Sequence, residues 1–229
     1  MSDTPPNFDP VARLYRTMER IVFGSALDNT RRHHIGSLPN KGRVLLLGDG
    51  VGRFLQAALH RHPSLEFVSV DASKSMLALA QRHIKERDVD RVSLVHSDAT
   101  DFLHHGNADG FDAVVTHFFL DCFDSDGLTV LVPKIAAQLR TGSPWLISEF
   151  DTPTGTGLSS ILGRLLLPTM YGFFRLATRL PANRLPDWRL ALSTEGLVCE
   201  SQHASPTGLL VSEVWNTKPT RSSGVRSAS

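Results

Sequence analysis

The stretch that decides the fold is residues 43–52, which read RVLLLGDGVG. Its first half is a mostly apolar run, typical of a strand in a parallel sheet, because helices cover both faces of such a sheet. Gly48, Gly50 and Gly52 follow at once, and a helical pattern begins at Phe54. A strand, a glycine-rich turn and a helix in this order are typical of the first unit of a nucleotide-binding α/β fold.

The same alternation of strand and helix continues along the chain. Helices are predicted between the strands, over residues 54–62, 73–85 and 127–139. Strands are predicted over residues 43–47, 65–70, 91–96, 111–116, 143–150, 196–205 and 209–215. The last two flank the turn at 206–208 and form a hairpin. We therefore expect a doubly wound, mainly parallel, seven-stranded α/β sheet of the Rossmann type that ends in an antiparallel hairpin.

The chain divides into five segments around this sheet. They are an N-terminal arm and helical cap (1–40), the Rossmann-like core (41–151), a helical insert (152–190), the closing hairpin (191–216) and a disordered tail (217–229). Residues 152–186 contain four arginines, no Asp or Glu, and a dense apolar pattern. We expect helices there that form a lid over the functional site; a plain helical pair on the sheet or at a dimer interface is the alternative.

The composition limits the function. The chain of 229 residues has 24 basic and 23 acidic side chains, a net charge of +1, which gives no general attraction for nucleic acid. The only cysteines are Cys122 and Cys199, and no Cys or His spacing is typical of a metal site, so we expect no metal. Neither a signal peptide nor an apolar run of about 18 residues is visible, and this favours a cytoplasmic protein.

Other nucleotide-binding families are excluded at the glycine turn. The dinucleotide fingerprint needs a third glycine at the position of Arg53, and no Gly-Lys-Ser/Thr of a P-loop follows. Further motifs follow the next predicted strands: VDASKSML at 70–77, HSDA at 96–99 and FDAVV at 111–115. With the glycine turn they resemble the class I S-adenosylmethionine-dependent methyltransferases, over roughly residues 40–150 and the closing hairpin.

The resemblance implies S-adenosylmethionine as cofactor and a role for each matching residue. Asp71 binds the ribose hydroxyls and Asp98 accepts from the adenine amino group. Other positions line the same ligand: Gly48, Gly50 and Gly52 at the methionine part, Ala72, Met76 and Ala99 at the adenine, and Thr116 and His117 at the methionine moiety and sulfonium. The alternative for each acid is a helix cap or a turn.

One position departs from the family pattern. An acidic residue usually stands two before the first glycine, and this chain has Leu46 there. We expect Asp49, inside the turn, to contact the amino group of the cofactor instead. We also expect Tyr15, on an N-terminal helix, to close the cofactor site; a half-buried aromatic on an amphipathic helix is the alternative.

Methyl transfer needs an aligned nucleophile and, for an oxygen or carbon nucleophile, a base. His117 is a candidate base, because the ordinary pKa of histidine, about 6.5, suits proton abstraction near neutrality. Asp121, four residues on, is a candidate to orient His117 or to touch the acceptor. A packed histidine and a helix-capping aspartate are the structural alternatives.

The residues after the fourth strand indicate the class of acceptor. Residues 116–119 read THFF, not the Asn/Asp-Pro-Pro-Tyr/Phe motif of methyltransferases acting on amino groups of nucleic-acid bases. The phenylalanines and the insert favour a small, apolar or aromatic acceptor. A non-catalytic binding protein of the same fold, or an enzyme that meets a lipid or quinone acceptor at a membrane surface, remain the alternatives. The sequence leaves open whether the chain is a monomer or a homodimer.

Overall fold

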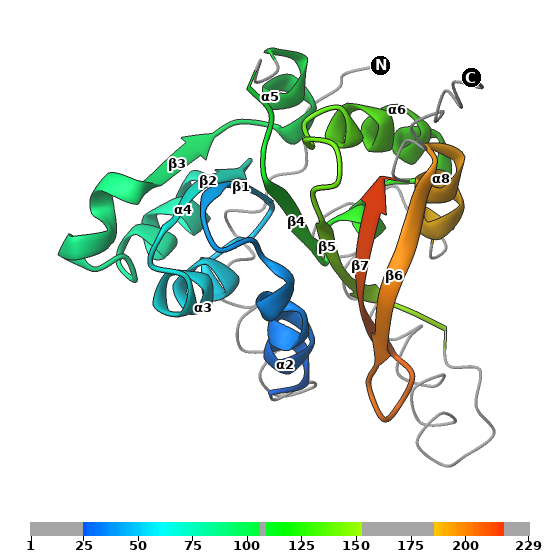
Figure 1. Cartoon of the computed structure of the whole chain (residues 1–229), viewed down its shortest axis with the longest axis horizontal. Coiled ribbons are helices and arrows are strands. Elements are labelled where there is room, and N and C mark those ends of the chain that lie inside the picture. The colour runs from blue at the N-terminus through cyan, green and yellow to red at the C-terminus, as the bar shows by residue number, and fades with distance from the viewer. Residues whose placement is uncertain (1–24, 106–108, 153–185, 218–229) are drawn as a thin grey trace, which may run out of the picture.

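The structure, a computed structural model, describes residues 25–105, 109–152 and 186–217 (Figure 1). Its centre is a seven-stranded sheet with the strand order β3-β2-β1-β4-β5-β7-β6. The strands are β1 (Gly42–Leu47), β2 (Leu65–Asp71), β3 (Val92–His96), β4 (Ala113–His117), β5 (Trp145–Phe150), β6 (Leu197–Ala204) and β7 (Leu210–Thr217). All neighbours from β3 to β5 pair in parallel, whereas β7 is antiparallel to β5 and β6. The predicted sheet with its closing hairpin is confirmed.

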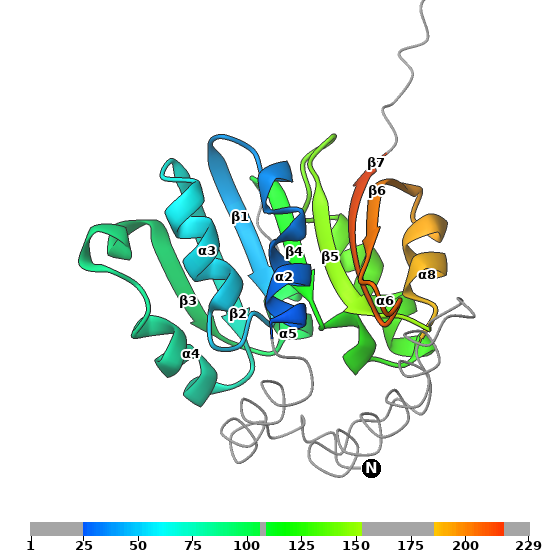
Figure 2. The same cartoon turned by 90° about the horizontal axis from the view of Figure 1, so that it is seen from below.

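Helices cover both faces of this sheet (Figure 2). Helices α2 (Ala26–His33) and α3 (Arg53–Arg61) pack on one face, and α4 (Lys74–Gln81) lies beside α3. The other face carries α5 (Ala99–His105), α6 (Ser125–Ala136) and α8 (Trp188–Thr194). Three short 3-10 segments connect them: η1 (Ile35–Ser37), η2 (Glu86–Arg91) and η3 (Leu120–Cys122).

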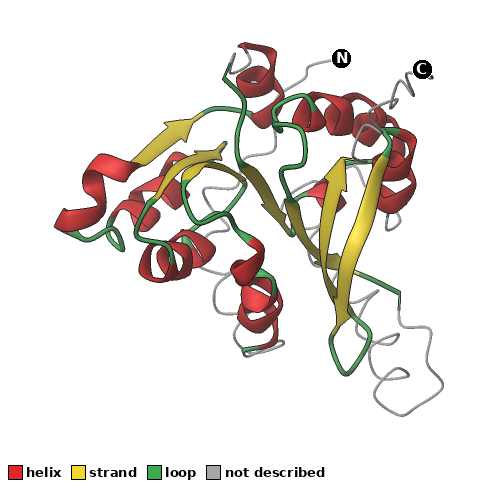
Figure 3. Ribbon diagram, viewed as in Figure 1, coloured by secondary structure: helices red, strands yellow, loops and turns green. Residues whose placement is uncertain are grey.

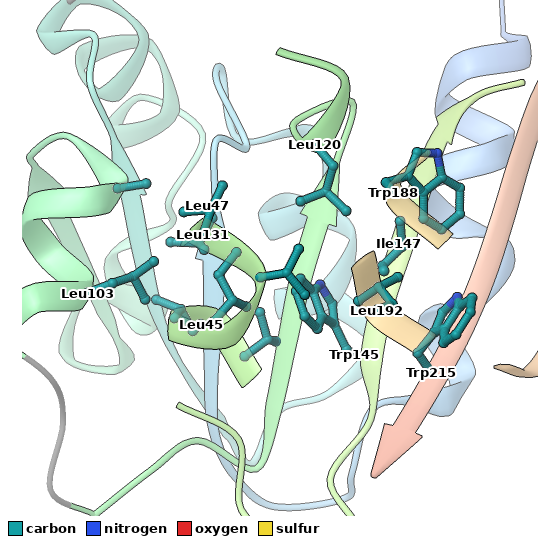
Figure 4. Packing of buried hydrophobic residues seen from close by; sticks show 14 of the residues in the cluster. Leu45, Leu47, Leu103, Leu120, Leu131, Trp145, Ile147, Trp188, Leu192 and Trp215 are labelled. Atoms are coloured by element: carbon teal, nitrogen blue, oxygen red, sulfur yellow. The ribbon is translucent and has the colours of Figure 1, made fainter. Parts of the chain in front are cut away.

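The larger core lies between the sheet and the second set of helices (Figure 4). Trp145 of β5 is fully buried there, beside Leu45 of β1 and Leu131 of α6. Fully burying an aliphatic or aromatic side chain of this size contributes roughly 1.5–3 kcal/mol. The four consecutive buried residues of β1, from Val44 to Leu47, alternate between this core and the one under α3. That is why the strand reads as a continuous apolar run.

Helix starts follow local capping rules. Ser73 accepts from the backbone N–H of Met76 at the start of α4, as its position predicts. Asp124, and not Asp121, caps α6 by accepting from the N–H of Gly127. Arg189 of α8 forms ion pairs with two acids. One is the buried Glu213 of β7, at 2.7 Å, and the other is Asp151, just after β5, at 2.8 Å, so α8 is linked to the closing hairpin.

Some predicted boundaries are wrong. The helix predicted to run to Lys85 ends at Gln81, because the chain turns into a loop before η2. The strand predicted from Phe111 begins at Ala113, and Phe111 makes only an isolated bridge to Leu139. Helices α5 and α8 have seven residues each, too few for a visible period.

Several predicted features lie outside the described residues. These are the N-terminal arm and the part of the helical cap up to residue 24, most of the lid insert (153–185) and the tail from 218. Within the part of the chain that is described, no helix is long and apolar enough to cross a membrane.

The topology places a ligand site. The sheet starts at β1 and extends outward to β3, and the chain then returns to β4 on the other side of β1 (Figures 1 and 3, in the same view). In open α/β sheets, ligands bind outside the carboxyl ends of the strands at such a reversal of order. The residues that follow β1, β2, β3 and β4 therefore meet at one edge of the sheet, and these are the segments that carry the sequence motifs.

Candidate functional site

Glycines shape the turn between β1 and α3. Gly48 has φ = 70° and Gly50 has φ = 59°, in the left-handed region that residues with a side chain rarely adopt. A Cβ atom on Gly48 would lie 2.6 Å from Cδ2 of Phe119, so the loop after β4 packs directly on this backbone. Among the described residues, a Cβ on Gly50 would meet only Sδ of Met76, at 4.0 Å. The Gly50 backbone therefore leaves room for a ligand, with Met76 beside it.

Asp71, the last residue of β2, is tied to this turn. Its Oδ2 accepts a hydrogen bond from the backbone N–H of Gly50 at 3.0 Å, and its Oδ1 accepts from the N–H of Ser73 at 2.8 Å. These bonds fix the carboxylate beside the glycine turn, where a ribose-binding acid is expected in this fold. The structure thus brings together Gly50, Asp71 and Met76; their contact with a cofactor stays a prediction.

Asp98 stands beside Asp71 at the same edge. The backbone N–H of Ser97 donates to the carbonyl of Asp71 at 3.2 Å, which joins the ends of β3 and β2. The Oδ1 atom of Asp98 accepts from the N–H of Thr100 at 2.7 Å and so caps the start of α5. The adjacent positions assigned to the adenine follow these acids in the chain: Ala72 and Ala99.

Asp49 points into the start of α3. Its two oxygens accept from the backbone N–H groups of Phe54 at 3.2 Å and Leu55 at 2.9 Å, so it satisfies the first turn of that helix. Removal from water raises the pKa of Asp49 to about 6, although these bonds and the positive charge of Arg31 oppose the rise. Each carboxylate oxygen keeps a second lone pair for a cation, and the predicted contact with the cofactor amino group stays a prediction.

Arg31 of α2 is a site residue that the sequence did not single out. Its side chain is largely buried and its Nη1 atom pairs with Asp28 at 3.1 Å. The guanidinium lies over the ring of Phe118 at 4.9 Å, and its charge acts on both Asp49 and His117. Only the docking of α2 against the strand ends shows this, because Arg31 sits in a run of polar residues typical of an exposed helix.

His117 ends β4 in a buried place. Its ring stands edge-on to Phe54 at 4.7 Å, and 6% of the residue is exposed. Its Nδ1 atom has no hydrogen-bond partner among the described residues. Burial lowers the pKa of His117 well below its ordinary value, and the positive charges of Arg31 and His34 lower it further. The imidazole is therefore neutral at pH 7 and a weak base.

Thr116 faces the opposite side of β4. It is fully buried, and its Oγ1 atom accepts a hydrogen bond from Nε1 of Trp145 at 2.9 Å. This side chain holds the larger core together beneath the site, and its predicted contact with a cofactor stays a prediction.

Backbone strain marks the residue after β4. Phe118 has φ = 54°, and among the described residues it is the only one other than glycine with a positive φ. Its N–H donates to the carbonyl of Ser148 at 2.7 Å, and its ring lies 5.0 Å from that of Phe150. Strain of this kind persists where the surrounding structure fixes the conformation, and it is common at functional sites.

Two carboxyl groups meet just beyond this strained residue. Oε1 of Glu149, in β5, accepts from the backbone N–H groups of Phe119 at 3.0 Å and Leu120 at 2.8 Å. Its Oε2 atom is buried without a hydrogen-bond donor among the described residues, next to the carboxyl group of Asp121. Glu149 was not predicted as a site residue, although it is the one charged residue in the apolar run 143–150.

In the described part of the chain, Asp121 does not form a hydrogen bond with Nδ1 of His117. Asp121 accepts from Sγ of Cys122 at 3.7 Å and interacts with Glu149. His117 contacts Phe54 and lies near the charges on α2, as given above. The other predicted site residue, Tyr15, lies outside the described residues. Within the described ranges, no group of three or more His, Cys, Asp or Glu is arranged to hold a metal ion.

Comparison with known proteins supports the same family. Residues 44–142 match the family model described as a methyltransferase domain. Polyamine aminopropyltransferase 2 of Caldanaerobacter subterraneus subsp. tengcongensis is 32% identical over 79 residues, which cover 34% of this chain and 27% of that protein. Carboxy-S-adenosyl-L-methionine synthase of Campylobacter hominis is 29% identical over 117 residues, which cover 49% of this chain and 46% of the synthase. The chain thus spans less than half the length of these two curated relatives.

A solved structure shares the fold. The O-methyltransferase NcsB1 from neocarzinostatin biosynthesis, solved with S-adenosylmethionine and 2-hydroxy-5-methyl naphthoic acid, has a TM-score of 0.60 and 17% identity. The match covers 92% of this chain and 59% of NcsB1. The methyltransferase-domain match over residues 44–142 and the shared fold confirm the resemblance to the class I S-adenosylmethionine-dependent methyltransferases that the motifs after β1 to β4 predict.

Proposed function

We propose that this protein transfers a methyl group from S-adenosylmethionine to a small, apolar or aromatic organic acceptor. The observation that carries the proposal is the hydrogen bond from Gly50 to Asp71 next to the reversal of strand order, beside a glycine backbone that leaves room for a ligand. This arrangement supplies a carboxylate for ribose hydroxyls and open backbone for the rest of the cofactor.

The charges at the edge of the sheet suit this cofactor. S-adenosylmethionine supplies an activated methyl group on a sulfonium cation, so the protein mainly has to bind and align it. Asp71 would hold the ribose, and Met76 and Asp98 the adenine. Asp49 and Arg31 would present opposite charges to the amino and carboxylate groups of the methionine part. More acidic than basic side chains lie at this edge of the sheet, and this favours a ligand of positive charge. The acids are Asp49, Asp71, Asp98, Asp121 and Glu149, and the base is Arg31.

Aromatic side chains support the class of acceptor. Two pairs of rings lie at the loop after β4. The ring centroids of Phe118 and Phe150 are 5.0 Å apart, and those of Phe119 and Phe123 are 5.2 Å apart. Offset and edge-to-face contacts with such rings stabilise a bound aromatic compound. NcsB1, which shares the fold, was solved with a naphthoic acid. The insert at 158–180, expected to cover the acceptor, lies outside the described residues.

A transfer assay tests the proposal. The purified protein would be incubated with methyl-deuterated S-adenosylmethionine and a panel of phenols, quinols and aromatic amines, and the products analysed by mass spectrometry. We expect at least one acceptor to gain a labelled methyl group, with loss of transfer in Asp71→Asn and retention in the exposed control Asp90→Asn. Transfer to none of the panel, with the cofactor bound, would favour a non-catalytic binding protein.

A further inference from the structure

The carboxyl pair at the ends of β4 and β5 has a feature that the proposed function leaves unused. Glu149 is fully buried and uses Oε1 to hold the loop after β4, while Oε2 has no donor among the described residues. Asp121, from η3, stands next to it and is partly exposed. A buried carboxylate oxygen without a donor is costly, and one proton between the two groups removes that cost.

We propose that Asp121 and Glu149 share a single proton, held by Glu149, and that Asp121 takes up the proton which the acceptor loses during methyl transfer. This inference rests on the proposed function. Glu149 is a positioning residue in it: protonated Oε2 donates to Asp121, and Oε1 fixes the loop that carries Asp121.

The pKa shifts of the two carboxyl groups agree with a proton held by Glu149 and a charged Asp121. Burial, together with the negative charge of Asp121, raises the pKa of Glu149 well above its ordinary range. Burial also raises the pKa of Asp121, to about 6, in spite of its hydrogen bonds with Cys122 and Glu149. Two adjacent carboxyl groups cannot both ionise easily, so at pH 7 one is protonated and the other charged.

Among the described residues, few other titratable groups interact with the pair. Cys122, the neighbour of Asp121, has its pKa raised by burial and by the charges of Asp121, Glu149 and Asp71, so it stays a neutral thiol. Across the sheet, β7 places Val211 opposite Glu149. Asp121 follows the end of β4, at the edge of the sheet where the residues after β1 to β3 also lie, and the charge of Asp71 acts on the neighbouring Cys122.

Proton uptake by Asp121 would keep the net charge of the buried site unchanged during methyl transfer. The acceptor atom forms a bond to the methyl carbon as the carbon–sulfur bond breaks and its electron pair stays on sulfur. The acceptor proton passes to the carboxylate of Asp121. The sulfonium charge and the carboxylate charge thus disappear together, and the site avoids an unpaired buried charge. His117 is poorly suited to this task, because its surroundings disfavour the protonated ring.

The proton on Glu149 can be detected without any ligand. Infrared spectra at pH 7 should show the carbonyl band of a protonated carboxyl group that is absent in Glu149→Gln and present in the exposed control Glu66→Gln. A wild-type spectrum without this band, or a band that survives in Glu149→Gln, would overturn the shared proton.

The role of Asp121 can be tested without an acceptor. Calorimetric titration near pH 6, in buffers of different ionisation enthalpy, gives the number of protons exchanged on binding. S-adenosylhomocysteine has no sulfonium charge, so its complex should hold more protons than the S-adenosylmethionine complex, by up to one. We expect this difference to be kept in Glu149→Gln and lost in Asp121→Asn.

The outcomes separate the two proposals. A proton difference that survives in Asp121→Asn belongs to another group, such as Asp49, and would overturn the role of Asp121. Failure of both ligands to bind would overturn the proposed function and the role of Asp121 with it, whereas the infrared band would still decide whether Glu149 holds a proton.

Discussion

At the scale of single residues, the site depends on a close contact between backbone and ring. Gly48 touches Phe119, and Gly142 has a similar left-handed backbone with φ = 77° but no described atom within 4 Å of an added Cβ. Both Gly→Ala variants therefore adopt an unfavourable conformation, at a cost of roughly 1–2 kcal/mol. Only Gly48→Ala adds a steric clash, which costs about 1–3 kcal/mol more.

Urea denaturation of the two variants checks this prediction. We expect Gly48→Ala to lower the free energy of unfolding by clearly more than Gly142→Ala does. Equal losses would mean that Phe119 moves aside freely and that the loop after β4 does not rest on the glycine turn.

The residues that were predictable from sequence lie within a few positions of a strand end. Gly48, Gly50 and Asp71 follow apolar runs at fixed spacing, and the parallel sheet then brings them together. Arg31 and Glu149 were not predictable in the same way. Arg31 reaches the site only through the docking of α2. Glu149 is a candidate for a shared proton only because Asp121, 28 positions away in the sequence, lies next to it.

At the scale of elements, Asp49 joins the glycine turn to α3. The pKa of Asp49 is about 6 in the folded protein, against about 3.9 for a free aspartate. The folded state therefore binds this proton more tightly than the unfolded chain. The contribution of that difference to stability is fully present below about pH 4 and is lost as the pH rises through about 6.

Asp49→Asn removes this titration and one of the two helix-capping acceptors. We expect the variant to be less stable than wild type at about pH 4, by about 1 kcal/mol for the lost cap. The gap should narrow or reverse by about pH 7, because the wild type then carries a partly desolvated charge. Denaturation curves across this range, with the exposed control Asp90→Asn, measure the gap; a gap independent of pH would contradict the raised pKa.

Elements with a strong period were predicted, and short ones were not. Strand β1 is recognisable because it is buried on both faces and is therefore apolar throughout. Helix α3 is recognisable because one side of it is buried, so its apolar residues recur at helical spacing. Helices α5 and α8 are held by tertiary packing of Leu103, Trp188 and Leu192 rather than by a period of their own. The alternation of strands and helices predicted the doubly wound sheet but not the order of its strands, which the structure supplies.

At the scale of the whole molecule, the strand order forms one candidate ligand site. The reversal of strand order between β1 and β4 collects a ribose-type acid, an open glycine backbone and a cluster of carboxylates at one edge of the sheet. If that edge binds S-adenosylmethionine, Asp71 at the end of β2 must contribute to the affinity, whereas an exposed acid elsewhere, such as Asp90, must not.

Calorimetric titration with S-adenosylmethionine tests this claim most directly, using wild type, Asp71→Ala and the exposed control Asp90→Ala. We expect binding by wild type and by Asp90→Ala, and an affinity at least about tenfold lower in Asp71→Ala, equivalent to about 1.4 kcal/mol. Equal affinities in all three proteins, or no binding by wild type, would contradict it.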